Sequence, residues 1–205
     1  MRLTNLSGFD YSWYSHSYIT TQHRKFYDEI SAKIISFKCG EVSAVDFFLN
    51  VVKGAFANRG LAFDYVIRAL SSEELTASDG QPMDKVGELI ASLTNSIYRN
   101  DLICKSHVTP QFITLKTLQE RERVIRNVYS ATQELNIDKK RVLIIDDVIT
   151  TGTTLLEIRR SLHSPINTIS FNSYCLAKSS HNDNSNIAFE LGIDGDLEDF
   201  ENELM

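Results

Sequence analysis

Residues 142–154 read Val-Leu-Ile-Ile-Asp-Asp-Val-Ile-Thr-Thr-Gly-Thr-Thr, and this stretch decides the fold. The apolar residues 142–145 predict a buried strand. Asp146 and Asp147 follow at its carboxyl end, and a short turn of hydroxyl residues around Gly152 comes next. A helix is then indicated by the spacing of Leu155, Ile158 and Leu162.

The turn has the features of a phosphate site. It presents backbone N–H groups and a helix N-terminus to an anion, and Gly152 lets the backbone approach without a Cβ in the way. Asp146 and Asp147 lie where they accept hydrogen bonds from sugar hydroxyls. We therefore expect a pocket for a phosphorylated sugar. Its phosphate would be bound by Val148, Thr150, Thr151, Gly152, Thr153 and Thr154. An ordinary strand followed by an N-capped helix is the alternative interpretation.

This stretch resembles the phosphoribosyl pyrophosphate (PRPP) loop of the type I phosphoribosyltransferases. The pattern of that loop is a hydrophobic strand, two acids, two hydrophobic residues and Thr-Thr-Gly-Thr-Thr, and the match is complete from Val142 to Thr154. The resemblance implies binding of PRPP or a nucleoside monophosphate with Mg²⁺, and transfer of the phosphoribosyl group to a nitrogenous base. It implies catalytic roles for Asp146 and Asp147 at the ribose hydroxyls, with Mg²⁺ held by these carboxylates through water rather than directly.

A second loop is expected to bind the pyrophosphate. In the family, backbone groups after the first core strand do so, and that position falls here at Arg68, Ala69, Leu70 and Ser71. The glycine or lysine of many members is missing, and Glu73 and Glu74 follow. This departure favours an alternative, a catalytically weak or inactive regulator that binds PRPP or a nucleotide. After the next strand, Lys105 is expected to contact pyrophosphate with its point charge.

The region after Lys105 resembles the ComF-like branch of the family. The residues that carry this resemblance are Lys105, Thr109, Gln111, Leu115, Arg123 and Arg126-Asn127-Val128. The spacing from Thr to Gln is one residue shorter than in that branch, and its N-terminal zinc ribbon is missing because no Cys pairs occur. His107 falls in the loop that covers the ligand in the family. The set Arg121, Arg123 and Arg126 is predicted to form a solvated helix face.

Helical and strand patterns alternate along the chain and predict an α/β fold, a parallel sheet flanked by helices with an extra helical N-terminal segment. Residues 1–61 are expected to form an irregular aromatic arm, up to residue 18, and a helical extension. Residues 62–178 form the phosphoribosyltransferase-like core, and 179–205 an acidic tail for which disorder is one interpretation. Helices are predicted at 19–37, 45–56, 86–97 and 118–135, and strands at 63–70, 101–105, 142–145 and within 166–177.

Composition limits the functional classes. Eight of the 27 acidic residues lie from Ser179 onward, where the sequence has no Lys or Arg. The net charge of −6 therefore arises from this tail. Nucleic-acid binding is therefore not indicated. No apolar run is long enough for a membrane, and the isolated Cys39, Cys104 and Cys175 suit a reducing cytoplasm. The aromatic arm or the acidic tail is a candidate contact for a protein partner or a homodimer, or for a larger complex.

Overall fold

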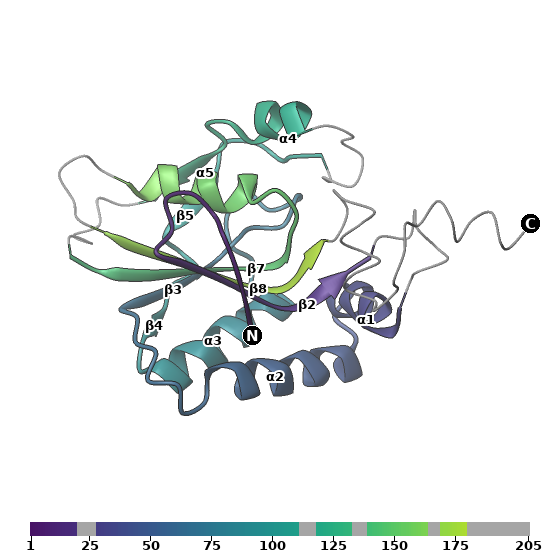
Figure 1. Ribbon diagram of the computed structural model, residues 1–205. Coiled ribbons are helices and arrows are strands. Elements are labelled where there is room, and N and C mark those ends of the chain that lie inside the picture. Colours follow the sequence, from purple (N-terminus) through teal and green to yellow (C-terminus); the bar gives the residue numbers. More distant parts are fainter. Residues whose placement is uncertain (20–27, 111–117, 133–138, 164–168, 180–205) are drawn as a thin grey trace, which may run out of the picture.

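The structure is a computed structural model that describes residues 1–19, 28–110, 118–132, 139–163 and 169–179 (Figure 1). The predictions for Gln111, Leu115 and the acidic tail beyond residue 179 lie outside these residues. No helix in the described part of the chain is both long and apolar enough to cross a bilayer.

The centre of the molecule is a six-stranded sheet with the order β1-β2-β8-β7-β3-β4. Only β1 pairs antiparallel, and the remaining neighbours are parallel, which confirms the predicted α/β fold. The strands are β1 (Arg2–Thr4), β2 (Tyr11–Tyr18), β3 (Tyr65–Arg68), β4 (Ile97–Tyr98), β7 (Arg141–Ile149) and β8 (Ser170–Ser179).

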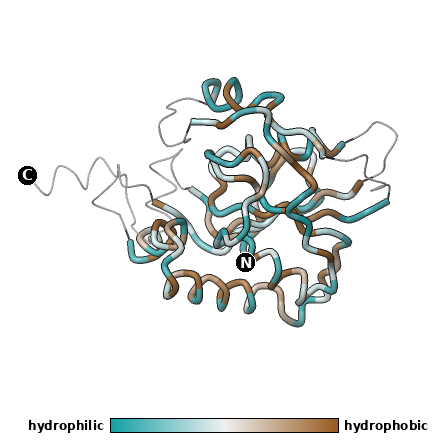
Figure 2. The backbone as a smooth tube through the Cα atoms, turned by 180° about the vertical axis from the view of Figure 1, so that it is seen from behind, coloured by the Kyte–Doolittle hydropathy of each residue, from teal (hydrophilic) through white to brown (hydrophobic). Residues whose placement is uncertain are grey.

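Helices cover both faces of the sheet (Figure 1). One face carries α1 (Glu29–Lys38), α2 (Val42–Phe56) and α3 (Pro82–Thr94), and the other carries α4 (Leu118–Ile125) and α5 (Thr153–Leu162). Side-chain alternation along β7 supplies both cores: Leu143 and Ile145 belong to the α1–α3 side, and Val142 and Ile144 to the α5 side. Figure 2 shows hydrophobic residues along the central strands and also on the long helix α2 below them.

Local sequence signals explain where the helices begin. Asp28 caps α1, because its side chain accepts a hydrogen bond from the Ser31 N–H at 2.7 Å. Helix α3 begins with Pro82 at its first turn and has a reciprocal capping box between Gln81 and Asp84. Its carboxyl end is Asn95, which adopts a left-handed conformation with φ of 53°.

The N-terminal residues differ from the prediction of an irregular arm. Residues 11–18 form β2, which pairs in parallel with β8, and β1 folds back on β2. The aromatic residues Tyr11, Trp13, Tyr14 and Tyr18 explain the strand, because aromatic residues fit a half-buried pleated surface. Helices α1 and α2 lie in the region that follows, and the extra helical N-terminal segment stays a prediction. The boundary at residues 61/62 stays a prediction.

Two elements near residue 130 also correct the prediction. Strand β5 (Ile103–Lys105) does not join the main sheet but pairs antiparallel with β6 (Tyr129–Ala131) in a separate two-stranded sheet. The helix predicted to run through residue 135 instead ends at Ile125. Asn127 has a φ of 58°, in the left-handed region that interrupts a helix, and β6 follows at once.

Candidate functional site

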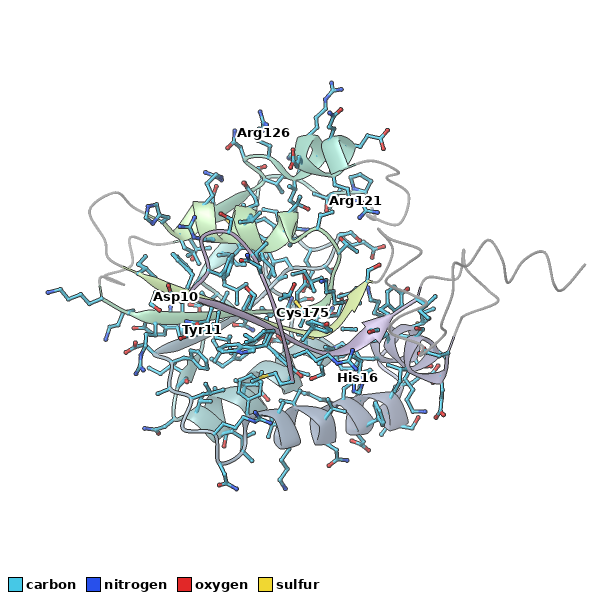
Figure 3. The ribbon with its side chains drawn as sticks, viewed as in Figure 1. Asp10, Tyr11, His16, Arg121, Arg126 and Cys175 are labelled. Atoms are coloured by element: carbon cyan, nitrogen blue, oxygen red, sulfur yellow. The ribbon has the colours of Figure 1, made fainter. Side chains whose placement is uncertain are left out.

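The site lies at the sheet edge where the parallel strands β7 and β3 end side by side. Arg68 at the end of β3 pairs with Ile145 of β7, so the loop after β3 lies beside the acid pair. Asp146 and Asp147 are within β7 rather than beyond it, since Asp146 still pairs with Cys175 of β8. In Figure 3, Cys175 marks this region in the middle of the sheet. Ligands of open parallel sheets bind beyond such carboxyl ends.

The turn after β7 keeps its backbone donors free. Gly152 is the N-cap residue of α5 with φ of 79°, a conformation that favours glycine. No described residue accepts a hydrogen bond from the N–H groups of residues 152–155, which include the first turn of α5. The hydroxyls of Thr151 and Thr153 lie 3.3 Å apart beside them. This is the arrangement that the sequence predicts for binding a phosphate.

One side of this turn is covered by the N-terminal segment. A Cβ placed on Gly152 would lie 2.5 Å from Leu6 Cδ1, so the two residues are in tight contact. Gly152 and Thr153 are buried, whereas Thr150, Thr151 and Thr154 are half-buried. The turn is therefore shielded on the Leu6 side and partly exposed through its threonines. Sequence patterns gave no signal for Leu6, because its contact is set by the β1–β2 connection.

The two carboxylates have different surroundings. Alternation along β7 directs Asp147 to the α1 side, where Asp147 Oδ2 lies 3.1 Å from Lys38 Nζ of α1. Asp147 Oδ1 accepts the Val148 N–H at 2.6 Å. Asp146 Oδ1 accepts the Asp147 N–H at 2.9 Å, and Asp146 Oδ2 has no hydrogen-bond partner among the described residues. Lys38 carried no motif signal, since it appears in the sequence only as a basic residue near a helix end.

Burial and the neighbouring charge of Asp147 raise the pKa of Asp146 to about 7, against the opposing effects of Lys38 and Lys105. Asp147 is the member held by a direct cation, and Asp146 is the member whose neutral form is favoured by burial.

The side chain of Arg68 is turned into the protein and is only 2% exposed. Its guanidinium forms two hydrogen bonds with Glu74, each of 2.8 Å, and its Nε donates to Asp84 Oδ1 of α3 at 2.6 Å. The Arg68 side chain is thus engaged by carboxylates of the protein, and the pyrophosphate role of the Arg68–Ser71 backbone stays a prediction. Arg68 faces α3, where a buried guanidinium needs paired carboxylates.

The backbone donors of the loop after β3 are already engaged. The Ala69 N–H donates to Ile145 O at 2.8 Å, and the Leu70 N–H to the Tyr129 hydroxyl at 3.2 Å. The Ser71 N–H donates to Glu74 Oε2 at 2.7 Å. None of these N–H groups is therefore free for a ligand as the loop stands.

Lys105 of β5 also contacts the loop after β3. Its Nζ donates to Ser71 O and lies 3.4 Å from Thr109 Oγ1, and the side chain covers the ring of Tyr129. Burial lowers the pKa of Lys105 to about 8, while Glu74 and Asp146 oppose this effect. A pyrophosphate contact by Lys105 stays a prediction; its ammonium has three N–H donors, and two of them are accounted for by Ser71 O and Thr109 Oγ1.

Other basic side chains lie elsewhere. Arg123 and Arg126 are exposed and Arg121 is half-buried, and Arg126 follows the end of α4 rather than sharing its face. Figure 3 places Arg121 and Arg126 at the α4 edge, away from Cys175. His107 is exposed, with Nδ1 2.9 Å from Ser106 Oγ. No group of three or more His, Cys, Asp or Glu suited to a metal occurs in the part of the chain that the structure describes.

Several solved structures are similar to this chain. The hypoxanthine phosphoribosyltransferase from Staphylococcus aureus shares 16% identity over 66% of this chain and 65% of that chain, with a TM-score of 0.38. The adenine phosphoribosyl transferase from Trypanosoma brucei, in complex with AMP, pyrophosphate and ribose-5-phosphate, shares 14% identity over 69% and 67%, with a TM-score of 0.38. The orotate phosphoribosyltransferase from Aeropyrum pernix shares 16% over 77% and 81%, with a TM-score of 0.36. These TM-scores are too low to support a functional conclusion.

The chain thus spans about 65% of the length of the first of these proteins. No curated protein matches the sequence. The family model of the phosphoribosyl transferase domain matches residues 83–184, which include the acid pair and the Thr-Gly turn. The match begins after Arg68–Ser71, so it does not include the loop whose N–H groups are engaged. Residues 83–184 therefore match the family of the phosphoribosyl transferase domain.

Proposed function

We propose that the protein binds a ligand that contains ribose 5-phosphate, either PRPP or a nucleoside monophosphate, and transfers the phosphoribosyl group to a nitrogenous base. The observation that carries this proposal is that the N–H groups of residues 152–155, at the N-terminus of α5, have no acceptor in the part of the chain that the structure describes. Oriented amides and the helix dipole attract a phosphate there. The hydroxyls of Thr150, Thr151 and Thr154 add donors from the half-buried side.

The two aspartates would hold the ribose. Asp146 Oδ2, which has no described partner, accepts a hydrogen bond from one ribose hydroxyl, and Asp147 accepts one from the other beside Lys38. Negative charge here stabilises the positive charge that develops on the ring as the glycosidic bond breaks. Chemistry of this kind depends on position and electrostatics, so no side-chain nucleophile is required.

The residues fit Mg²⁺ in the manner that the sequence predicts. Mg²⁺ prefers oxygen ligands, keeps several waters and binds through one or two carboxylates together with substrate phosphates. Asp146 and Asp147 would hold the ion through water, and no dedicated metal cage is needed for that. When bound, Mg²⁺ would neutralise the charge of the pyrophosphate leaving group.

Calorimetry tests the proposal directly. The full chain is titrated with PRPP, ribose 5-phosphate and AMP, each with Mg²⁺, and pyrophosphate release is then measured with a panel of purine and pyrimidine bases. Binding with base-dependent release supports the transferase. Asp147→Asn should lower this turnover strongly while circular dichroism stays unchanged, and unchanged turnover would count against the roles given to the aspartates.

A second candidate function is that of a regulator that binds a phosphoribosyl ligand without transferring it. The observation that favours it is the engagement of the Ala69, Leu70 and Ser71 N–H groups within the protein. Binding without pyrophosphate release, across the whole panel of bases, would support this function. A homodimer, a protein partner and a cytoplasmic location remain expectations from the sequence.

A further inference from the structure

Glu74 occupies a complete anion site made by its own chain. Its Oε1 accepts the Ser78 N–H at 2.9 Å and the Ser78 hydroxyl at 2.6 Å, and its Oε2 accepts the Ser71 N–H at 2.7 Å. Arg68 adds a two-bond guanidinium contact at 2.8 Å for each oxygen. Burial alone would raise the pKa of Glu74, but these hydrogen bonds outweigh it and hold the pKa well below its usual range.

The donors around Glu74 are those that a diphosphate would need. A loop of backbone N–H groups with an arginine fork recognises carboxylate and phosphate oxygens by the same geometry. At the β3 end of the sheet these donors face a carboxylate of the protein, which is only 8% exposed. The Lys105 ammonium of β5 reaches this loop and is bonded to Ser71 O.

We infer that Glu74 is a built-in competitor for the pyrophosphate of PRPP, so that this site favours a singly phosphorylated ribose, such as ribose 5-phosphate or a nucleoside monophosphate, over PRPP. The inference rests on one part of the proposed function, namely that the 5-phosphate binds at residues 152–155. Recognition of the diphosphate requires Glu74 to leave the loop. Glu74 is therefore a specificity-determining residue that touches no ligand itself.

The wild-type protein gives the first test. Calorimetry with ribose 5-phosphate and with PRPP, both with Mg²⁺, should give dissociation constants within about threefold of each other, because the diphosphate gains no free donors. PRPP binding that is tenfold tighter, or more, would overturn the inference and leave the proposed function standing. If neither ligand binds, the proposed function fails, and the inference fails with it.

A pair of variants gives the second test. Glu74→Gln removes the charge that competes for Ser71 N–H and Arg68, and it should raise the affinity for PRPP relative to ribose 5-phosphate about tenfold. Glu73→Gln is the matched control, since it removes the same charge from the exposed neighbouring position. The control should change the ratio less than about twofold.

An equal shift in both variants would show a general charge effect and overturn the role of Glu74. Circular dichroism and thermal unfolding establish whether Glu74→Gln is folded. If it is not folded, the comparison of the two ligands on the wild-type protein still decides the question.

Discussion

Two loops at the same edge of the sheet differ in where their backbone donors go. After β7, the N–H groups of residues 152–155 have no acceptor among the described residues. After β3, the N–H groups of Ala69, Leu70 and Ser71 all have acceptors within the protein. Both loops follow parallel strands that are hydrogen-bonded neighbours.

The difference shows that backbone N–H groups in a turn can bind a ligand only where no group of the protein already accepts their hydrogen bonds. In the β7 turn a glycine removes the side chain and a helix begins, so the donors stay open. In the β3 loop a single acid, Glu74, returns to the turn and satisfies it. Buried polar groups have hydrogen-bond partners. In the β3 loop the partner is the protein itself, and in the β7 turn the partner would be a ligand.

Removing Arg68, the cation at the loop after β3 (the closed loop), should lower the stability more than any other change considered. Arg68→Ala leaves the buried carboxylates of Glu74 and Asp84 without their shared partner, which should lower the free energy of unfolding by about 3–5 kcal/mol. Urea denaturation measures the loss. The control Arg99→Ala breaks a pair in which the Asp101 side chain is 52% exposed, and should change stability by less than about 1 kcal/mol. Equal losses would contradict the role of burial.

A smaller loss of stability is expected at the open turn, together with a loss of binding. Gly152→Ala places a Cβ 2.5 Å from Leu6 Cδ1 at a φ of 79°, and the free energy of unfolding should fall by about 2 kcal/mol. Ribose 5-phosphate should no longer bind in calorimetry. Gly60→Ala shares the positive φ but meets no atom within 4 Å, so it should lose less stability and keep binding. If both variants bind alike, the turn is not the phosphate site.

The ion pair beside the open turn should contribute less. Lys38→Met removes a cation whose side chain is 46% exposed, and the free energy of unfolding should fall by no more than about 1 kcal/mol. Lys33→Met, which breaks the exposed pair with Glu29 one turn earlier on α1, is the control. A loss of several kcal/mol for Lys38→Met alone would mean that Asp147 is far more buried than the structure shows.

The pH dependence of stability should change slightly at Asp146. Its pKa is about 7 in the folded protein and about 4 in an unfolded chain, so the folded state binds the proton more tightly. This group therefore favours folding most below pH 4, and the benefit is lost as the pH rises towards 7. Asp146→Asn should make the fall in Tm between pH 5 and 7 shallower. Asp46→Asn, at an exposed position, should not.

The sequence predicts the position and character of the turn after β7, but for the loop after β3 it predicts the position and not the contacts. Residues 142–154 give the strand, the acids and the helix, because hydrophobic periodicity and turn chemistry are local signals. The partners Lys38, Leu6 and Tyr129 come from distant segments, and no local pattern encodes them. Arg68 was placed at the correct strand end, but its direction depends on α3, which supplies Asp84. Strand β2 differs from the expected irregular arm, because its parallel partner β8 lies far away in the sequence and no local pattern encodes that pairing.

That last pairing has a consequence for synthesis on the ribosome. Ser12 of β2 and Ser173 of β8 share a hydrogen bond of 2.8 Å although they are 161 positions apart. Strand β2 therefore cannot pair with β8 until β8 has been synthesised. Until then its aromatic residues are available to chaperones and to aggregation. Nascent chains stalled before residue 170 should therefore hold this N-terminal hairpin undocked, and proteases should cut it there.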